Sequence, residues 1–151
     1  MLILACGNRQ RGDDAAGILV AEKLRALGVE VKICEPSALL DTWAGADNLI
    51  LIDTVVTGCP PGTMHVWDGP PPRKSKGVTS THGFGIMDAI ELARIMDRLP
   101  VRVRVYGIEG HNFALGDEAS EAVRRGVEEV VRNILFNLQG KQQIGPHQPA
   151  R

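Results

Sequence analysis

The stretch LILID at residues 49–53 decides the fold class, because four consecutive apolar residues leave no strand face for water. A strand that is apolar on both faces is typical of a parallel sheet covered by helices on either side. The stretch MLILAC at residues 1–6 is a second short apolar run, and it stops at Gly7. The two runs therefore predict two buried strands.

Strand and helix patterns alternate along the rest of the chain. Further strands are expected over residues 29–33, 63–67 and 101–105, and helices over residues 14–27, 38–44, 84–99 and 118–138. This alternation predicts an α/β fold: a single three-layer αβα domain with a largely parallel, twisted sheet of about five strands. We expect the domain to span residues 1–138. Residues 139–151 are polar with Pro and Gly, and they predict a flexible tail.

Composition excludes several classes of function. The hydrophobic content of 44% and charged content of 23% are ordinary for a soluble globular protein. A net charge of -1 provides no electrostatic attraction to nucleic acid or to an anionic membrane. No run reaches the roughly 18 apolar residues of a membrane span. Because no exposed apolar stripe requires a partner, a monomer is the default expectation.

The three cysteines do not form a recognisable framework. Cys6, Cys34 and Cys59 are an odd set without metal-type spacing, so we expect no disulfide network and a reducing, cytoplasmic location. All three thiols are expected to be buried and inert, and His65 carries no functional signal. No Ser or Cys lies on a nucleophile elbow of the G-x-S-x-G type, which disfavours nucleophilic catalysis.

Polar residues follow several of the predicted strands. Asp13 and Asp14 follow the first strand, Asp53 ends the run at residues 49–52, and Glu109 with His111 follows the strand at residues 101–105. In parallel sheets ligands bind outside the carboxyl ends of the strands. These residues are therefore expected along one edge. Glu109 and His111 are either supporting groups of a site or simply part of a polar turn.

Three of the polar residues are the candidate site. One of Asp13 and Asp14 is expected to cap the following helix, which leaves the other free to bind a cation or a substrate group. Asp53 needs a partner, or a turn to cap, to offset its desolvation. His82, in STHGFG, is an ordinary loop histidine when taken alone. Together with two carboxylates it would complete a mixed oxygen and nitrogen site suited to zinc, nickel or iron.

Four motifs give the chain a resemblance to a known family. They are LACGN with GDDAAG in residues 4–17, LILIDTVVTG at 49–58, STHGFGIMDAIELA at 80–93, and YGIEG at 106–110 before a long helix. In this order and at these intervals, they make the chain similar to the maturation endopeptidases of nickel–iron hydrogenases, from Met1 to about Leu138.

The resemblance implies a function and a set of site residues. It implies removal of the C-terminal extension of a hydrogenase large-subunit precursor after nickel insertion. It also implies that Asp14, Asp53 and His82 are the catalytic and metal-binding residues, with Asp13 capping and orienting. The metal would be nickel, supplied by the substrate, with zinc or cadmium as a surrogate. The partner would be the large-subunit precursor.

Two mechanisms are compatible with Asp14, Asp53 and His82. In one, a metal held by them polarises the scissile carbonyl and lowers the pKa of a bound water. In the other, nickel anchors the substrate and a carboxylate acts as general base on water. We favour the anchor, because a permanent catalytic zinc commonly has more imidazole ligands. Two other functions stay open: a non-catalytic module that senses or carries nickel, and a self-sufficient metallohydrolase of small peptides.

Overall fold

The computed structural model describes residues 1–70 and 85–140, and in these residues the strands form one five-stranded sheet of order β2-β1-β3-β5-β4. The strands β2, β1, β3 and β5 run parallel, whereas β4 pairs antiparallel with β5 at one edge. Their bounds are Leu2–Ala5 for β1, Lys32–Ile33 for β2, Asn48–Val55 for β3, Met64–Asp68 for β4 and Arg102–Glu109 for β5. The predicted α/β class and largely parallel sheet are confirmed.

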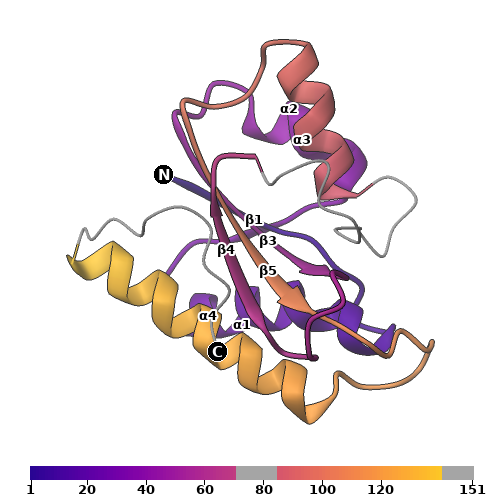
Figure 1. Ribbon diagram of the computed structural model, residues 1–151. Coiled ribbons are helices and arrows are strands. Elements are labelled where there is room, and N and C mark those ends of the chain that lie inside the picture. The colour runs from indigo at the N-terminus through magenta and orange to yellow at the C-terminus, as the bar shows by residue number, and fades with distance from the viewer. Residues whose placement is uncertain (71–84, 141–151) are drawn as a thin grey trace.

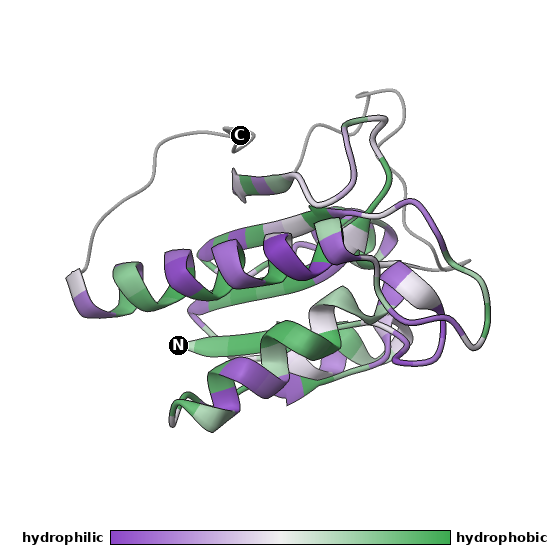
Figure 2. Ribbon diagram, turned by 90° about the horizontal axis from the view of Figure 1, so that it is seen from below, coloured by the Kyte–Doolittle hydropathy of each residue, from purple (hydrophilic) through white to green (hydrophobic). Residues whose placement is uncertain are grey.

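Helices cover both faces of the sheet (Figure 1). One face carries α1 (Ala16–Ala26) and α4 (Glu121–Gly140), and the other carries α2 (Leu39–Trp43) and α3 (Ile86–Ile95). The strands are mainly hydrophobic along their length, whereas the helices alternate hydrophobic and hydrophilic residues (Figure 2). Each helix therefore buries one apolar side against the sheet, and two apolar clusters result, one on each face.

Several element ends differ from the sequence expectation. The predicted helix at residues 14–27 begins as the 3-10 turn η1 (Gly12–Ala15) and becomes α-helical only at Ala16. The predicted strand at 29–33 is reduced to two exposed residues, because β2 is an edge strand that pairs only with β1. Helix α3 ends at Ile95, ahead of a left-handed Asp97 with φ of 55°, and does not reach residue 99.

Two parts of the sequence expectation fall partly outside the described residues. The expected tail, residues 139–151, lies outside them from residue 141 onward, while α4 itself ends at Gly140. His82 also lies outside them. Within residues 1–70 and 85–140, no helix combines the length and apolar character that crossing a lipid bilayer requires.

Strand register places Asp53 of β3, His65 of β4 and Glu109 of β5 on one face of the sheet. Asp53 of β3 pairs with Gly107 of β5, which in turn pairs with His65 of β4. Directly paired residues project to the same face, here the face that α2 and α3 cover. A Cβ on Gly107 would lie 2.9 Å from a Val55 methyl and 3.0 Å from the Trp67 ring, so the glycine allows these two side chains to pack directly over the β5 backbone.

Candidate active site

The predicted acidic residues lie at the carboxyl ends of β1 and β3. Asp13 and Asp14 belong to η1, directly after the loop that follows β1, and Asp53 lies near the end of β3. All three are buried, with exposed fractions of 0%, 1% and 0%. The start of α1 fits closely against this edge, because a Cβ on Gly17 would lie 2.1 Å from the carbonyl oxygen of Cys6.

Only one of the two carboxyl oxygens of Asp53 has a hydrogen-bond partner among the described residues. Its Oδ1 accepts a hydrogen bond of 2.7 Å from the backbone N–H of Thr54. Its Oδ2 is buried and has no hydrogen-bond partner within the described part of the chain. Burial raises the pKa of Asp53 well above its ordinary value, the Thr54 N–H lowers it in part, and the charge of Asp14 raises it further. The carboxyl group therefore favours a proton or a nearby cation.

Asp14 and Cys6 surround the same carboxyl group. Asp14 is close enough to Asp53 for its charge to raise the Asp53 pKa. Burial also raises the pKa of the Cys6 thiol, and the charges of Asp53 and, more weakly, Asp14 raise it further. The thiol is therefore neutral, as the sequence predicted for a buried cysteine. Burial and nearby negative charge thus act in the same direction on both the Asp53 carboxyl group and the Cys6 thiol.

Asp13 has a different role. Its Oδ2 accepts the backbone N–H groups of His111 and Asn112 at 2.8 and 2.9 Å, and its Oδ1 accepts that of Ser120 at 2.8 Å. Burial alone would raise the pKa of Asp13, but these three donors outweigh it and lower the pKa. Asp13 thus ties η1 to the loop after β5 and to the start of α4.

The expectation that Asp13 or Asp14 caps its own helix is wrong. Neither η1 nor α1 receives a side-chain capping bond. The donors that Asp13 satisfies belong to the segment just before α4, about a hundred residues away. The geometric reason is that η1 lies against the chain that leaves β5, since Asp13 N–H also donates to the Asn112 carbonyl at 2.7 Å.

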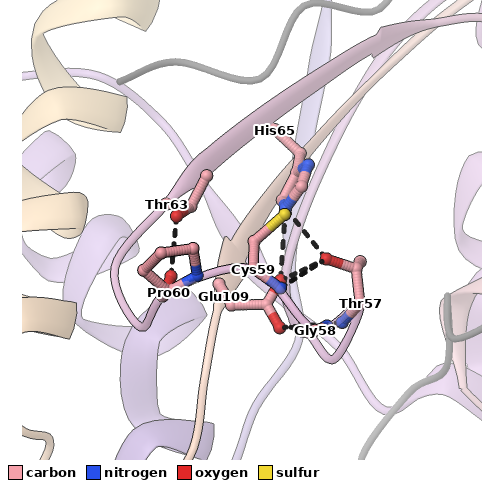
Figure 3. A network of polar contacts seen from close by, with 7 residues as sticks. All are labelled: Thr57, Gly58, Cys59, Pro60, Thr63, His65 and Glu109. Carbon is pink, nitrogen blue, oxygen red and sulfur yellow. Dashed lines mark hydrogen bonds and ion pairs between the residues drawn. The ribbon is translucent and has the colours of Figure 1, made fainter.

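Glu109 belongs to the polar turn after β3, and the backbone N–H of His111 binds Asp13. The Glu109 carboxylate is 1% exposed and accepts the N–H groups of Thr57 and Gly58 at 2.7 and 3.1 Å. It also accepts the Thr57 hydroxyl at 2.6 Å, which fixes the turn after β3 (Figure 3). The His111 side chain is exposed, while its N–H binds Asp13.

Sequence reasoning missed a polar cluster beside this turn. His65 is 3% exposed, and its Nε2 lies 3.2 Å from Glu109 Oε1. Cys59 is only half-buried, so the expectation that every thiol is buried is wrong for this residue. The ligand atoms of Cys59, His65 and Glu109 lie within 4.8 Å of one another. The alternation HVW in β4 could have placed His65 on the Glu109 face, but not beside Cys59.

The chemistry of the neighbouring Asp14 and Asp53 carboxyl groups fits a bound cation. An ion there would meet two carboxylates and would receive the Asp53 oxygen that has no partner among the described residues. It would also offset the cost of ionising a fully buried group. Carboxylate oxygens alone select hard ions, so a borderline ion such as nickel or zinc would need a further nitrogen or sulfur ligand.

Comparison with known proteins finds one family and a group of similar folds. The profile of the family described as hydrogenase maturation protease matches residues 34–137. The hydrogenase maturating endopeptidase HybD from E. coli is 22% identical with a TM-score of 0.74, and the match covers 98% of this chain and 96% of that one. No match was found among curated proteins.

Two archaeal structures are slightly more similar in sequence. The [NiFe] hydrogenase maturation protease HybD from Thermococcus kodakarensis is 26% identical, with a TM-score of 0.72 and coverage of 91% of this chain and 97% of that one. The maturation protease HycI from the same organism is 25% identical, with a TM-score of 0.72 and coverage of 91% of both chains. The similarity therefore extends over almost the whole chain.

Proposed function

This chain belongs to the hydrogenase maturation protease family, and from that premise we propose that it removes the C-terminal extension of a nickel–iron hydrogenase large-subunit precursor after nickel insertion. Membership makes the protein an endopeptidase, a hydrolase of peptide bonds. The client, the nickel dependence and the residues that act are the proposed part. Asp14, Asp53 and His82 would recognise the nickel that the precursor carries, and zinc or cadmium could substitute in its absence.

One observation carries the proposal. Asp53 Oδ2 is a fully buried carboxyl oxygen without a hydrogen-bond partner among the described residues, and the charge of Asp14 adds to the cost of ionising it. A group of this kind is destabilising unless it serves a ligand, because a buried polar atom without a partner costs about 1–3 kcal/mol. A nickel ion carried by the precursor would supply the positive charge that makes the ionised carboxyl favourable.

Orienting the substrate and activating the attacking water are separate steps of the proposed reaction. Before the precursor binds, burial and the charge of Asp14 raise the pKa of Asp53 and so favour its protonated form. When the precursor binds, this proton leaves and the carboxylate orients the substrate. A carboxylate beside the scissile bond accepts a proton from the attacking water as general base, and the proton is passed to the departing amine. Asp13 holds the loop after β5 in place throughout.

The test is to mix the purified chain with a large-subunit precursor, nickel-loaded or nickel-free, and to weigh the products. We expect the wild type to shorten only the loaded precursor. Asp53→Asn and His82→Ala should abolish cleavage, whereas Asp41→Asn, at an exposed carboxylate of α2, should cleave normally. Cleavage of the nickel-free precursor would contradict the nickel requirement. Binding of a loaded cognate precursor without any change of mass would contradict the proposed reaction.

The same samples separate the alternative functions. Turnover of a free short peptide, with tightly bound metal after purification, would indicate a self-sufficient metallohydrolase. Normal cleavage by Asp53→Asn would remove that carboxyl group from the mechanism. We expect neither result, because a protease without a substrate-borne requirement would have to avoid every other protein around it.

A further inference from the structure

A second cluster of metal-type ligands lies beside the turn that joins β3 to β4. Cys59 belongs to that turn, His65 to β4 and Glu109 to the end of β5. The backbone holds them together, since Gly62 N–H donates to the Glu109 carbonyl and Glu109 N–H donates to the Thr63 carbonyl, at 2.8 and 2.9 Å. Figure 3 shows the Cys59 sulfur and the His65 ring on the same side of the Glu109 carboxylate.

The distances suit a small ion. His65 Nε2 and Glu109 Oε1 are 3.2 Å apart. In a tetrahedral zinc site, with bonds of about 2.0–2.1 Å to nitrogen and oxygen, neighbouring ligand atoms lie about 3.3 Å apart. The Cys59 sulfur lies within 4.8 Å of both, so a modest side-chain rotation of this half-buried residue would bring it to a bond of about 2.3 Å.

The surrounding groups hold two of the three ligands in place. Glu109 accepts the N–H groups of Thr57 and Gly58 and the Thr57 hydroxyl, which fixes the direction of its carboxylate. The His65 ring stacks on the Trp67 ring, with centroids 5.1 Å apart and planes 3° from parallel. In metal sites, hydrogen bonds and packing contacts of this kind hold the ligating carboxylates and imidazoles in the orientation that the metal needs. Cys59, partly exposed, is the ligand that an ion from solvent would meet first.

A hydrogen-bonded pair of His65 and Glu109 would not by itself need a third ligand. The thiol is the feature that such a pair does not explain. One thiolate, one imidazole and one carboxylate form a mixed donor set that suits a borderline ion such as zinc, and three protein ligands leave a fourth position open.

We propose that Cys59, His65 and Glu109 bind one divalent ion of the zinc class. Binding releases the thiol proton and any proton shared by His65 and Glu109, and no oxidation occurs. The ion would clamp the turn after β3 to β5. The site is distinct from the Asp14 and Asp53 site, because Gly107 lies between His65 and Asp53 in the sheet. Their backbones are two strand spacings apart, roughly 9.6 Å. It does not depend on the proposed client.

The test uses the full chain, stripped of metal with a chelator and desalted, and titrated with Co²⁺ alone as the spectroscopic probe. We expect one equivalent to bind with a near-ultraviolet band from thiolate to cobalt, and one equivalent of Zn²⁺ to remove that band. Cys59→Ser should abolish the band and weaken Zn²⁺ binding at least tenfold. Cys34→Ser is the matched control, since Cys34 is also half-buried but bonds Glu35 and Thr42 instead.

Two further measurements keep the outcome decisive. Zn²⁺ should raise the melting temperature of Asp53→Asn, in which the other candidate metal site is disabled, but not that of the double variant Asp53→Asn/Cys59→Ser, since a ligand stabilises only the state that binds it. A wild type without the cobalt band would overturn the proposal. So would a double variant Asp53→Asn/Cys59→Ser that binds Zn²⁺ as tightly as Asp53→Asn does, or a Cys34→Ser variant that loses the band.

Discussion

Asp13 and Asp53 are the same residue type, and both have an exposed fraction of 0%. Their surroundings differ. Three backbone N–H groups donate to the two oxygens of Asp13, and they lower its pKa in spite of burial. One backbone N–H donates to Asp53, whose other oxygen has no partner within the described residues, and burial raises its pKa.

This contrast separates a structural carboxylate from a candidate functional one. Burial costs both groups their hydration, but hydrogen bonds to the charged form compensate only Asp13. A compensated charge stabilises the fold and needs nothing more. An uncompensated one lowers stability and is retained where a ligand makes up the difference. Burial and residue type alone would not distinguish the two, whereas the number of donors that face each carboxyl group does.

The largest effect is expected from Asp13→Ala. The substitution leaves the N–H groups of His111, Asn112 and Ser120 without their acceptor and detaches the start of α4 from η1. Each hydrogen bond to a charged group is worth about 1.5–3 kcal/mol. The three bonds share one carboxylate and their energies do not add in full, so we expect the free energy of unfolding to fall by about 3–5 kcal/mol. Urea denaturation followed by circular dichroism measures this change.

Asp117→Ala is the control for that measurement. Asp117 lies in the same loop, is exposed, and accepts one hydrogen bond of 3.0 Å from the Asn112 side chain. Its loss should cost under about 1 kcal/mol. If both variants were equally stable, the three hydrogen bonds to Asp13 would not be what holds this loop in place. Asp13 would then not be a compensated carboxylate, and the contrast with Asp53 would fail.

Asp53→Asn is expected to raise the free energy of unfolding at neutral pH, whereas Asp13→Ala lowers it. The folded-state pKa of Asp53 is raised, so its contribution to wild-type stability is fully present below the unfolded pKa of about 3.9 and is lost as pH rises through the folded pKa. An amide keeps the acceptor for Thr54 N–H and carries no charge. The variant should therefore match the wild type near pH 4 and exceed it increasingly towards pH 8.

Urea midpoints of both proteins across that range measure the difference. Each unit by which the folded pKa lies above the unfolded one is worth about 1.4 kcal/mol. Asp13 acts in the other direction, since its lowered pKa stabilises above the unfolded pKa and that stability is lost as the pH falls. An Asp53→Asn variant that is less stable than the wild type at pH 8 would show that the carboxylate is compensated after all.

The sequence predicted the parallel sheet because a strand buried on both faces appears as an uninterrupted run of apolar residues. Residues 49–53 contain no polar interruption, and the structure places them in the central strand β3. The ends of elements were less predictable. Whether residues 12–15 form a 3-10 turn depends on Asp13 reaching the chain after β5, and no window around Asp13 contains that information.

The candidate site was predictable only in part for the same reason. Strand ends in a parallel sheet meet at one edge, so Asp14 and Asp53 could be brought together from the sequence. Whether each charge is compensated by hydrogen bonds could not be predicted, because the donors to Asp13 lie 98 to 107 residues away along the chain. The position of Cys59 beside His65 and Glu109 depends on the register of β4 with β5, and residue spacing does not reveal it.

The smallest effect expected here concerns the link between Asp14 and Asp53. The charge of Asp14 raises the Asp53 pKa, but burial is the larger cause. Asp14→Asn should therefore lower the pKa of Asp53 while leaving it above the ordinary aspartate value. Carbon-13 resonances of labelled aspartate carboxyl groups, with the Asp53 signal assigned from Asp53→Asn, report this pKa directly and separately from any change in stability. An unchanged pKa would mean that the two carboxyl groups do not sense each other, and a single ion could then not be expected to bind both. A measurable decrease would indicate that they share one electrostatic environment, which is what joint recognition of a client's metal requires.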